Sequence, residues 1–164
     1  MLRTTNQNLK ILGIDPGYDR VGWAVGIYKN SKFEVEDLGC IQTNKKDDIF
    51  GRYNQIINEL QSVIEKFSPN SLAIEMLYFA KNKKTALRVS EARGVIISIA
   101  LNSGLEVFEY SPNEIKLAVT GSGAADKQAV EKMVKMQISY NLNGQIDDAI
   151  DALAVAMTHG FNKY

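Results

Sequence analysis

The chain has 164 residues, of which 45% are hydrophobic and 23% charged, and its 19 basic residues balance 19 acidic ones. Such a composition and length suit one compact globular domain, so we expect a single domain over residues 1–164. No apolar run reaches the ~20 residues that span a bilayer, and the polar N-terminus has no signal-peptide pattern, which predicts a cytoplasmic location. One cysteine and one histidine exclude an internal disulfide and a zinc site of Cys and His ligands. Any metal would therefore have oxygen ligands, as Mg²⁺ and Mn²⁺ do.

The first part of the chain alternates apolar and polar residues in the manner of strands. The predicted strands are 10–15, 21–29 and 32–43. Asn30 and Ser31 separate the last two as a hairpin connection. We expect the first strand to meet the other two as antiparallel neighbours.

The rest of the chain mixes helices with two short strands. A 3.6-residue apolar period predicts a helix over 47–67, ended by Ser68-Pro69-Asn70. The elements predicted after it are a strand ending at Glu75, a helix over 80–102, a strand over 105–110, a short helix after Pro112, and helices over 125–139 and 146–161. This order indicates an α/β domain with a mixed five-stranded sheet flanked by helices.

Acidic residues stand where strands end or a helix begins, which is where sites gather in open α/β sheets. Asp15 closes the first strand and Glu75 the fourth, while Asp147, Asp148 and Asp151 open the last helix. Some have ordinary explanations, because Asp-Pro-Gly is a favourable turn and Asp147 complements the helix dipole. Glu75 has strongly apolar neighbours, and a lone charge there is costly unless something such as a divalent cation compensates it.

Together the acids suggest phosphodiester hydrolysis, in which two divalent ions about 4 Å apart activate a water and stabilise the leaving oxygen. Carboxylates from several elements are needed to surround such hard cations. Residues three and four apart share a face of a helix, so the spacing leaves two pairs open in the last helix. They are Asp148 with Asp151 and Asp147 with Asp151.

Five segments in the same order and spacing resemble the RuvC crossover junction endodeoxyribonucleases. They are ILGIDPG, AIEMLYFAKN, ALRVSEARGV, VFEYSPNEIKLAVTGSGAADKQAV and DDAIDALAVAMTH, and the resemblance runs from Leu12 to His159. It implies a ribonuclease-H-like fold and a Mg²⁺-dependent enzyme, with Mn²⁺ as a substitute and two ions per active site. It also implies a homodimer that nicks two strands of four-way (Holliday) junction DNA symmetrically, in recombination and repair.

The family's final acidic motif, Asp-x-x-Asp-Ala-Leu-Ala, falls on Asp148 and Asp151. The resemblance therefore implies four catalytic, metal-binding acids: Asp15, Glu75, Asp148 and Asp151. Lys116 and Lys127 match family lysines near the scissile phosphate, where an ammonium group stabilises phosphoryl charge. Two surface lysines without a role in the reaction are the alternative.

Tyr78 matches a family aromatic residue that enters the junction and stacks on bases. The basic residues beyond it become, by the same resemblance, a segment that contacts phosphates: Lys81, Lys83, Lys84 and Arg88. On its own, such a run is typical of a solvated helix face. The helix that follows, with the sequence ARGVIISIALN, matches the family's dimer interface, and ordinary packing on the sheet is the alternative.

The chain departs from the family at Tyr18-Asp19-Arg20, where many members have a small polar residue. Because its net charge is zero, we expect tight DNA binding only at low salt or with a divalent ion. The resemblance further implies contact with the RuvA-RuvB branch-migration complex and a nucleoid-associated location. Rival classes are a YqgF-type ribonuclease-H-like nuclease acting on RNA or without junction selectivity, a domain of the actin and sugar-kinase superfamily, and a non-catalytic junction-binding protein.

Overall fold

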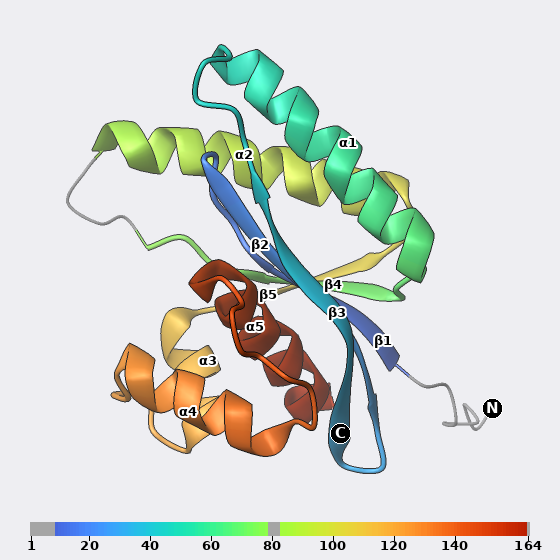
Figure 1. Cartoon of the computed structure of the whole chain (residues 1–164), viewed down its shortest axis with the longest axis vertical. Helices are drawn as coiled ribbons and strands as arrows, with labels where there is room; N and C mark the ends of the chain where they lie inside the picture. The colour runs from blue at the N-terminus through green and yellow to red at the C-terminus, as the bar shows by residue number, and fades with distance from the viewer. Residues whose placement is uncertain (1–8, 79–82, 164) are drawn as a thin grey trace.

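The computed structural model describes residues 9–78 and 83–163, which build a five-stranded sheet with helices on both faces (Figure 1). The elements are β1 (Leu9–Asp15), β2 (Arg20–Lys29), β3 (Lys32–Gln42), α1 (Ile49–Phe67), β4 (Ser71–Glu75), α2 (Lys83–Asn102), β5 (Glu106–Tyr110), α3 (Pro112–Thr120), α4 (Lys127–Gln137) and α5 (Asp147–Lys163). Helices α1 and α2 lie on one face of the sheet, and α3, α4 and α5 lie on the other. The predicted mixed α/β sheet of five strands is confirmed.

The sheet has the strand order β3-β2-β1-β4-β5. Strand β2 is antiparallel to β1 and β3, whereas β4 is parallel to β1 and β5. The expectation that β1 meets both following strands is wrong, because the crossover through α1 returns β4 to the other side of β1. Since Ile14 pairs with Ile74 in the parallel ladder, the strand ends Asp15 and Glu75 reach the same edge of the sheet.

Turn and cap residues account for where the elements stop. Asn30 and Ser31 both have positive φ, at 50° and 59°, as a two-residue type I′ hairpin requires. The Asp48 carboxylate accepts from Gly51 N at 2.7 Å and caps α1, so this helix begins two residues later than predicted. Asp126 caps α4 in the same way, which explains why the helix predicted over 125–139 is shorter. The start predicted for the helix over 80–102 lies outside the described residues.

Helix α5 packs directly on the middle of the sheet because small residues face it there. A Cβ added to Gly13 would lie 2.3 Å from the carbonyl oxygen of Ala152, and one added to Gly22 would lie 1.9 Å from that of Asp148. Atoms cannot approach so closely, and only glycine allows this contact. The first turns of α5 therefore lie over β1 and β2 beside Asp15.

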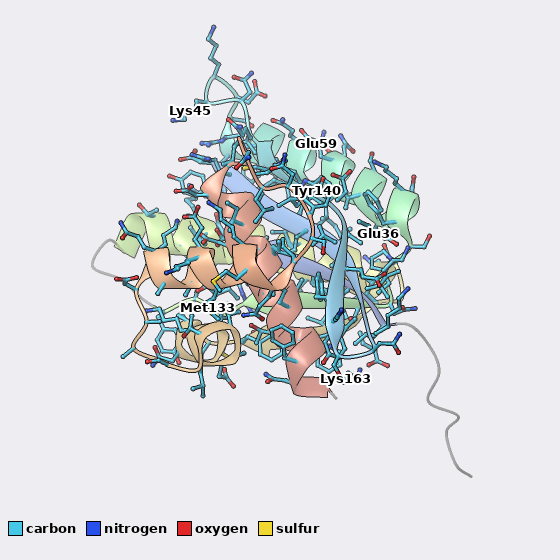
Figure 2. The ribbon with its side chains drawn as sticks, turned by 60° about the horizontal axis from the view of Figure 1, so that its bottom comes forward. Glu36, Lys45, Glu59, Met133, Tyr140 and Lys163 are labelled. Atoms are coloured by element: carbon cyan, nitrogen blue, oxygen red, sulfur yellow. The ribbon has the colours of Figure 1, made fainter. Side chains whose placement is uncertain are left out.

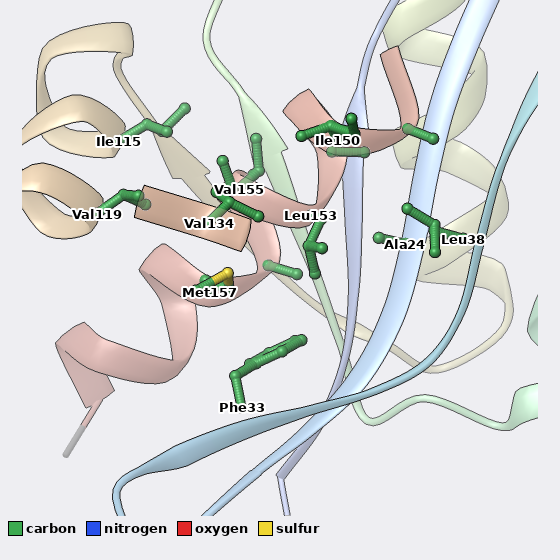
Figure 3. Packing of buried hydrophobic residues seen from close by; sticks show 14 of the residues in the cluster. Ala24, Phe33, Leu38, Ile115, Val119, Val134, Ile150, Leu153, Val155 and Met157 are labelled. Carbon is green, nitrogen blue, oxygen red and sulfur yellow. The ribbon is translucent and has the colours of Figure 1, made fainter. Parts of the chain in front are cut away.

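Two apolar clusters sandwich the sheet. Figure 3 shows the first, in which Leu153 and Met157 of α5 face Val134 of α4 and Phe33 of β3. The second lies under α1 and α2 and includes Ile96, so the inner face of α2 packs on the sheet in the ordinary way. Both faces of β1 are consequently buried, and the strand holds Asp15 rigidly.

Figure 2 labels charged side chains of both signs on different parts of the chain, with Glu36 on β3, Lys45 before α1, Glu59 on α1 and Lys163 on α5. Within residues 9–78 and 83–163, no helix is both long and apolar enough to cross a membrane.

Candidate active site

Four carboxylates from three segments converge at the edge of the sheet where β1 and β4 end. Asp15 and Glu75 are the last residues of adjacent parallel strands, and Asp148 and Asp151 occupy the first turns of α5. Burial, and to a smaller extent repulsion from the other three carboxylates, together raise the pKa of Asp15 to about 8. Because one buried carboxyl group senses all three others, the four acids form one electrostatic cluster.

The other acids of the cluster share this environment. Burial raises the pKa of Glu75, and repulsion from Asp151 adds to the effect, while Lys116 and Lys127 oppose it. Burial also raises the pKa of Asp151, against the lowering effect of a hydrogen bond from Lys127. Burial and mutual repulsion thus both oppose the ionised forms of Asp15, Glu75 and Asp151 in the ion-free site.

The two predicted lysines both lie at this cluster. Lys127, the first residue of α4, places Nζ 2.9 Å from Asp151 Oδ2 and 3.7 Å from Asp147 Oδ2. Lys116 of α3 lines a cavity of about 230 Å³ together with Glu75, Lys127 and Asp151. The cavity is therefore lined by two carboxylates of the cluster together with both lysines.

Of the acids that begin α5, Asp147 is the outward-facing one. Its side chain is 71% exposed, against 26% for Asp148 and 33% for Asp151. Asp148 and Asp151 are the two that raise the pKa of Asp15. Of the two pairs that the helical spacing allowed, Asp148 with Asp151 therefore lies nearer to Asp15 in its electrostatic effect than Asp147 with Asp151.

Arg20 is a further member of the site that the sequence analysis noted only as a departure from the family. This first residue of β2 places Nη2 2.7 Å from Asp148 Oδ2. Its guanidinium also contacts the side chain of Cys40 on β3. The signal available in the sequence was its position five residues after Asp15, at the start of the next strand.

Arg93 supports the site from α2. Its Nε donates to the backbone carbonyl of Glu75 at 3.1 Å, and its guanidinium pairs with Glu109 of β5. No local sequence pattern indicates this role of Arg93, because its partner groups are remote in the chain. The contact ties α2 and β5 to the end of β4.

The predicted DNA-contacting residues lie just after β4 and in the first part of α2, apart from one that is outside the described residues. Tyr78 is 69% exposed just beyond the end of β4 and lines a hollow with Met76 and Arg93. Arg88 on α2 pairs with Glu91 at 2.8 Å. Lys83 and Lys84 begin α2, and Lys81 lies outside the described residues.

The donor set suits a hard divalent cation, since it consists of carboxylate oxygens whose mutual repulsion such a cation would relieve. In the described conformation no three Asp, Glu, His or Cys side chains of residues 9–78 and 83–163 are arranged to hold a metal ion. Arg20 and Lys127 instead engage one oxygen each of Asp148 and Asp151. The acids are thus grouped by the fold, and their side chains would have to turn to share an ion.

Sheet order and the placement of the acids put the chain in the class of ribonuclease-H-like nucleases. The family profile described as crossover junction endodeoxyribonuclease RuvC matches residues 11–159. The chain is 43% identical over 155 residues to the crossover junction endodeoxyribonuclease RuvC of Finegoldia magna, covering 94% of each chain, and 43% identical over 150 residues to that of Petrotoga mobilis, covering 92% of each. The solved structure of Thermus thermophilus RuvC in complex with a Holliday junction substrate has a TM-score of 0.88 at 28% identity, covering 94% of each chain.

This chain belongs to the RuvC crossover junction endodeoxyribonuclease family. The membership confirms the resemblance described from the sequence motifs, and the ribonuclease-H-like fold is confirmed with it. The rival assignments to a YqgF-type nuclease, a sugar-kinase-type domain or a non-catalytic binding protein receive no support.

Proposed function

We propose that this chain resolves Holliday junctions by divalent-ion-dependent hydrolysis of one phosphodiester bond in each of two opposed strands. The observation that carries the proposal is the cluster of Asp15, Glu75, Asp148 and Asp151 at one edge of the sheet, where burial and repulsion from the other three acids oppose the negative charge that Asp15 would carry without a cation. A site of this charge attracts hard cations, and cations bridge it to a DNA phosphate.

The four carboxylates would hold Mg²⁺, or Mn²⁺ in its place, with two ions per active site. When bound, such ions supply Lewis-acid activation of water and of the phosphoryl oxygens. Asp15 is the central ligand of this scheme, because burial first and the three neighbouring carboxylates second oppose its charge. Its deprotonation would accompany ion binding.

Lys116 and Lys127 would stabilise the charge that develops on the scissile phosphate. Both line the cavity beside Glu75 and Asp151, and each lowers the pKa of Glu75, which shows how near their charges are to the carboxylates. A fixed ammonium group at such a place acts most strongly in the transition state, when the phosphoryl oxygens gain charge.

Tyr78 would stack on a base opened at the crossover, and basic residues of the neighbouring segment would contact phosphates. The exposure of Tyr78 beside Met76 supports this role, because an aromatic ring left in solvent next to an active site offers a stacking surface. The phosphate-contacting segment in this proposal comprises Lys81, Lys83, Lys84 and Arg88.

The functional unit would be a homodimer joined through the outer face of α2. Leu87, Gly94, Ser98 and Leu101 are exposed and recur at helical spacing, so they share one face of this helix. Two leucines at the ends and two small residues between them allow a second copy of the helix to approach closely. A two-fold dimer would present two identical sites to the two strands of a junction.

A cellular setting follows from the same activity. The substrate arises on chromosomal DNA, so we place the protein in the cytoplasm at the nucleoid, with the RuvA-RuvB branch-migration complex as a partner.

Cleavage of a synthetic four-way junction, compared with a linear duplex and an RNA hairpin, tests the proposal. We expect paired nicks in the junction alone, dependent on Mg²⁺ and abolished by EDTA. Asp15→Asn should retain junction binding and lose nicking by at least about a hundredfold, since a ligand of the ions is gone. Asp37→Asn, which alters a carboxylate of β3 paired with Lys66, is the matched control and should cleave normally.

Equal cleavage by wild type and Asp15→Asn would show that this site is not the active site. Equal cutting of RNA or linear DNA would instead favour a ribonuclease-H-like nuclease without junction selectivity.

A further inference from the structure

The charge of Asp148 is already matched by a cation that belongs to the chain. Arg20 Nη2 lies 2.7 Å from Asp148 Oδ2, and the remaining contact of the guanidinium described here is with the Cys40 side chain on the adjacent strand. Gly22, two residues further along β2, brings the backbone of Asp148 against this strand. Strand β2 therefore positions Asp148 through the close approach at Gly22 and pairs with its carboxylate through Arg20.

We propose that Arg20 is an internal competitor of the divalent ion, which holds the Asp148 carboxylate until the ion displaces it. The inference rests on the proposed function of the acidic cluster as an ion site. A guanidinium stays protonated at any physiological pH, so the pair is not released by proton loss and must be exchanged for another cation. Arg20 thereby acts as a positioning residue for a metal ligand.

Geometry and exposure favour exchange over a permanent pair. The Arg20 side chain is 47% exposed, whereas Asp148 is 26% exposed, so the arginine can swing into solvent while the carboxylate stays at the site. Such a partly exposed ion pair is weak, and a divalent ion shared by several carboxylates outweighs it. A released guanidinium beside the acids would then be free to meet a DNA phosphate, its preferred bidentate partner.

Arg20 differs in this respect from Lys127. Lys127 contacts Asp151 and also borders the cavity with Lys116 and Glu75, so its charge serves the phosphate site whether or not an ion is bound. Arg20 lies on the opposite side of the α5 start, on β2, and the contacts described for its guanidinium are with Asp148 and Cys40. Replacing Arg20 by a neutral residue should therefore free the Asp148 carboxylate to bind an ion, while Lys116 and Lys127 still provide positive charge at the cavity.

Titration of Mn²⁺ into the DNA-free, full-length protein tests the inference, with bound ion measured by calorimetry or electron paramagnetic resonance. We expect Arg20→Gln to bind Mn²⁺ about two- to fivefold more tightly than wild type, the change that a surface ion pair is worth. Arg20→Lys, which keeps the charge, should remain near wild type. Lys66→Gln also removes one positive charge, from a pair with Asp37 on β3, and should leave Mn²⁺ affinity unchanged.

A double-variant cycle makes the test specific. In an Asp148→Asn background, Arg20→Gln should no longer alter Mn²⁺ affinity, because its partner carboxylate is gone. Unchanged or weaker Mn²⁺ binding by Arg20→Gln in the otherwise wild-type chain would overturn the proposal, as would an effect that persists without Asp148. Arg20→Met removes the same charge with a different side chain and should give the same increase in Mn²⁺ affinity as Arg20→Gln. Thermal unfolding of every variant shows that each one is folded. Mn²⁺ affinity is measured without DNA. If the protein failed to cleave junctions, the proposed function would be wrong, but the measured effect of Arg20 on Mn²⁺ affinity would still stand.

Discussion

At the scale of single residues, the site brings carboxyl groups together where burial and mutual repulsion oppose their ionisation. Asp15 is held at the end of a buried strand, and three other carboxylates lie around it. A buried carboxyl group close to three others lowers the free energy of unfolding, and such destabilising arrangements are common at functional sites.

Asp15→Asn should therefore stabilise the ion-free protein at alkaline pH. The folded-state pKa of about 8 exceeds the ordinary value of 3.8, so the group favours folding fully only below pH 3.8, and this contribution is lost as the pH rises through 8. We expect a gain of about 1–3 kcal/mol at pH 8.5 in EDTA and little difference near pH 4. Urea unfolding measures the gain, with Asp37→Asn as control. An equally or less stable Asp15→Asn at pH 8.5 would contradict the electrostatic account.

His159 is the other strongly shifted residue, and its role is structural. It is 1% exposed on α5, its Nδ1 lies 2.7 Å from the Tyr110 hydroxyl, and its ring packs 4.3 Å from that of Phe108. Burial lowers its pKa to about 4, with a smaller contribution from Lys163. Between pH 4 and pH 6.5, the imidazole is therefore mostly neutral in the folded chain, whereas it is mostly protonated in the unfolded chain.

The folded protein should lose stability as the pH falls from about 6.5 to about 4. A lowered pKa means that the contribution of His159 is complete above the unfolded value of 6.5 and disappears towards the folded value. We expect this residue to account for about 2–3 kcal/mol of the loss over that interval. Unfolding free energies measured at several pH values should show a shallower slope for His159→Gln. An unchanged slope would mean that the pKa of His159 is the same in the native and unfolded states, which would contradict the effect of burial.

At the scale of elements, the contact of α5 with β1 and β2 decides whether the acids meet. The first turn of this helix can reach Asp15 because Gly13 and Gly22 leave no side chain between helix and sheet. The rest of the helix supplies the apolar anchor, with Leu153 and Met157 fully buried.

Gly22→Ala should impair both folding and cleavage. Its Cβ would meet the Asp148 carbonyl oxygen at 1.9 Å, so the start of α5 must move, and Asp148 with it. We expect a loss of about 1–3 kcal/mol from overpacking and a large fall in junction cleavage. Gly123→Ala is the control, since its Cβ would meet its nearest atom at an ordinary 3.5 Å. Calorimetry and a cleavage assay measure the two effects, and a Gly22→Ala protein with normal stability would refute the role of this close approach.

At the scale of the whole molecule, one site can cut only one strand, and a junction needs two cuts. The outer face of α2 carries Leu87 and Leu101, which are 60% and 57% exposed. Arg93 connects the same helix to the backbone of Glu75, so a partner docked on α2 would also steady the active site.

Leu101→Glu should convert the proposed dimer into monomers. A charge at a close helix contact lacks a partner and must be desolvated, which costs several kcal/mol in a symmetric interface because it occurs twice. Sedimentation velocity should show the change in mass, and junction cleavage should lose its paired cuts. Met136→Glu alters a residue of α4 that is 69% exposed and should keep the wild-type mass. A wild-type protein that sediments as a monomer at micromolar concentration would exclude this interface.

The sequence by itself determined the order and type of the elements and the strand ends at Asp15 and Glu75, and its family motifs predicted Asp148 with Asp151 as the pair of the last helix. These features depend on periodicity, turn residues and caps, which act over a few neighbouring positions. Only the tertiary structure decided that β4 pairs with β1, which brings the strand ends to one edge. It also decided that Arg20 pairs with Asp148 and that Arg93 holds the backbone of Glu75. Such contacts join residues far apart in the chain, and no local pattern specifies which remote partner a charged side chain will meet.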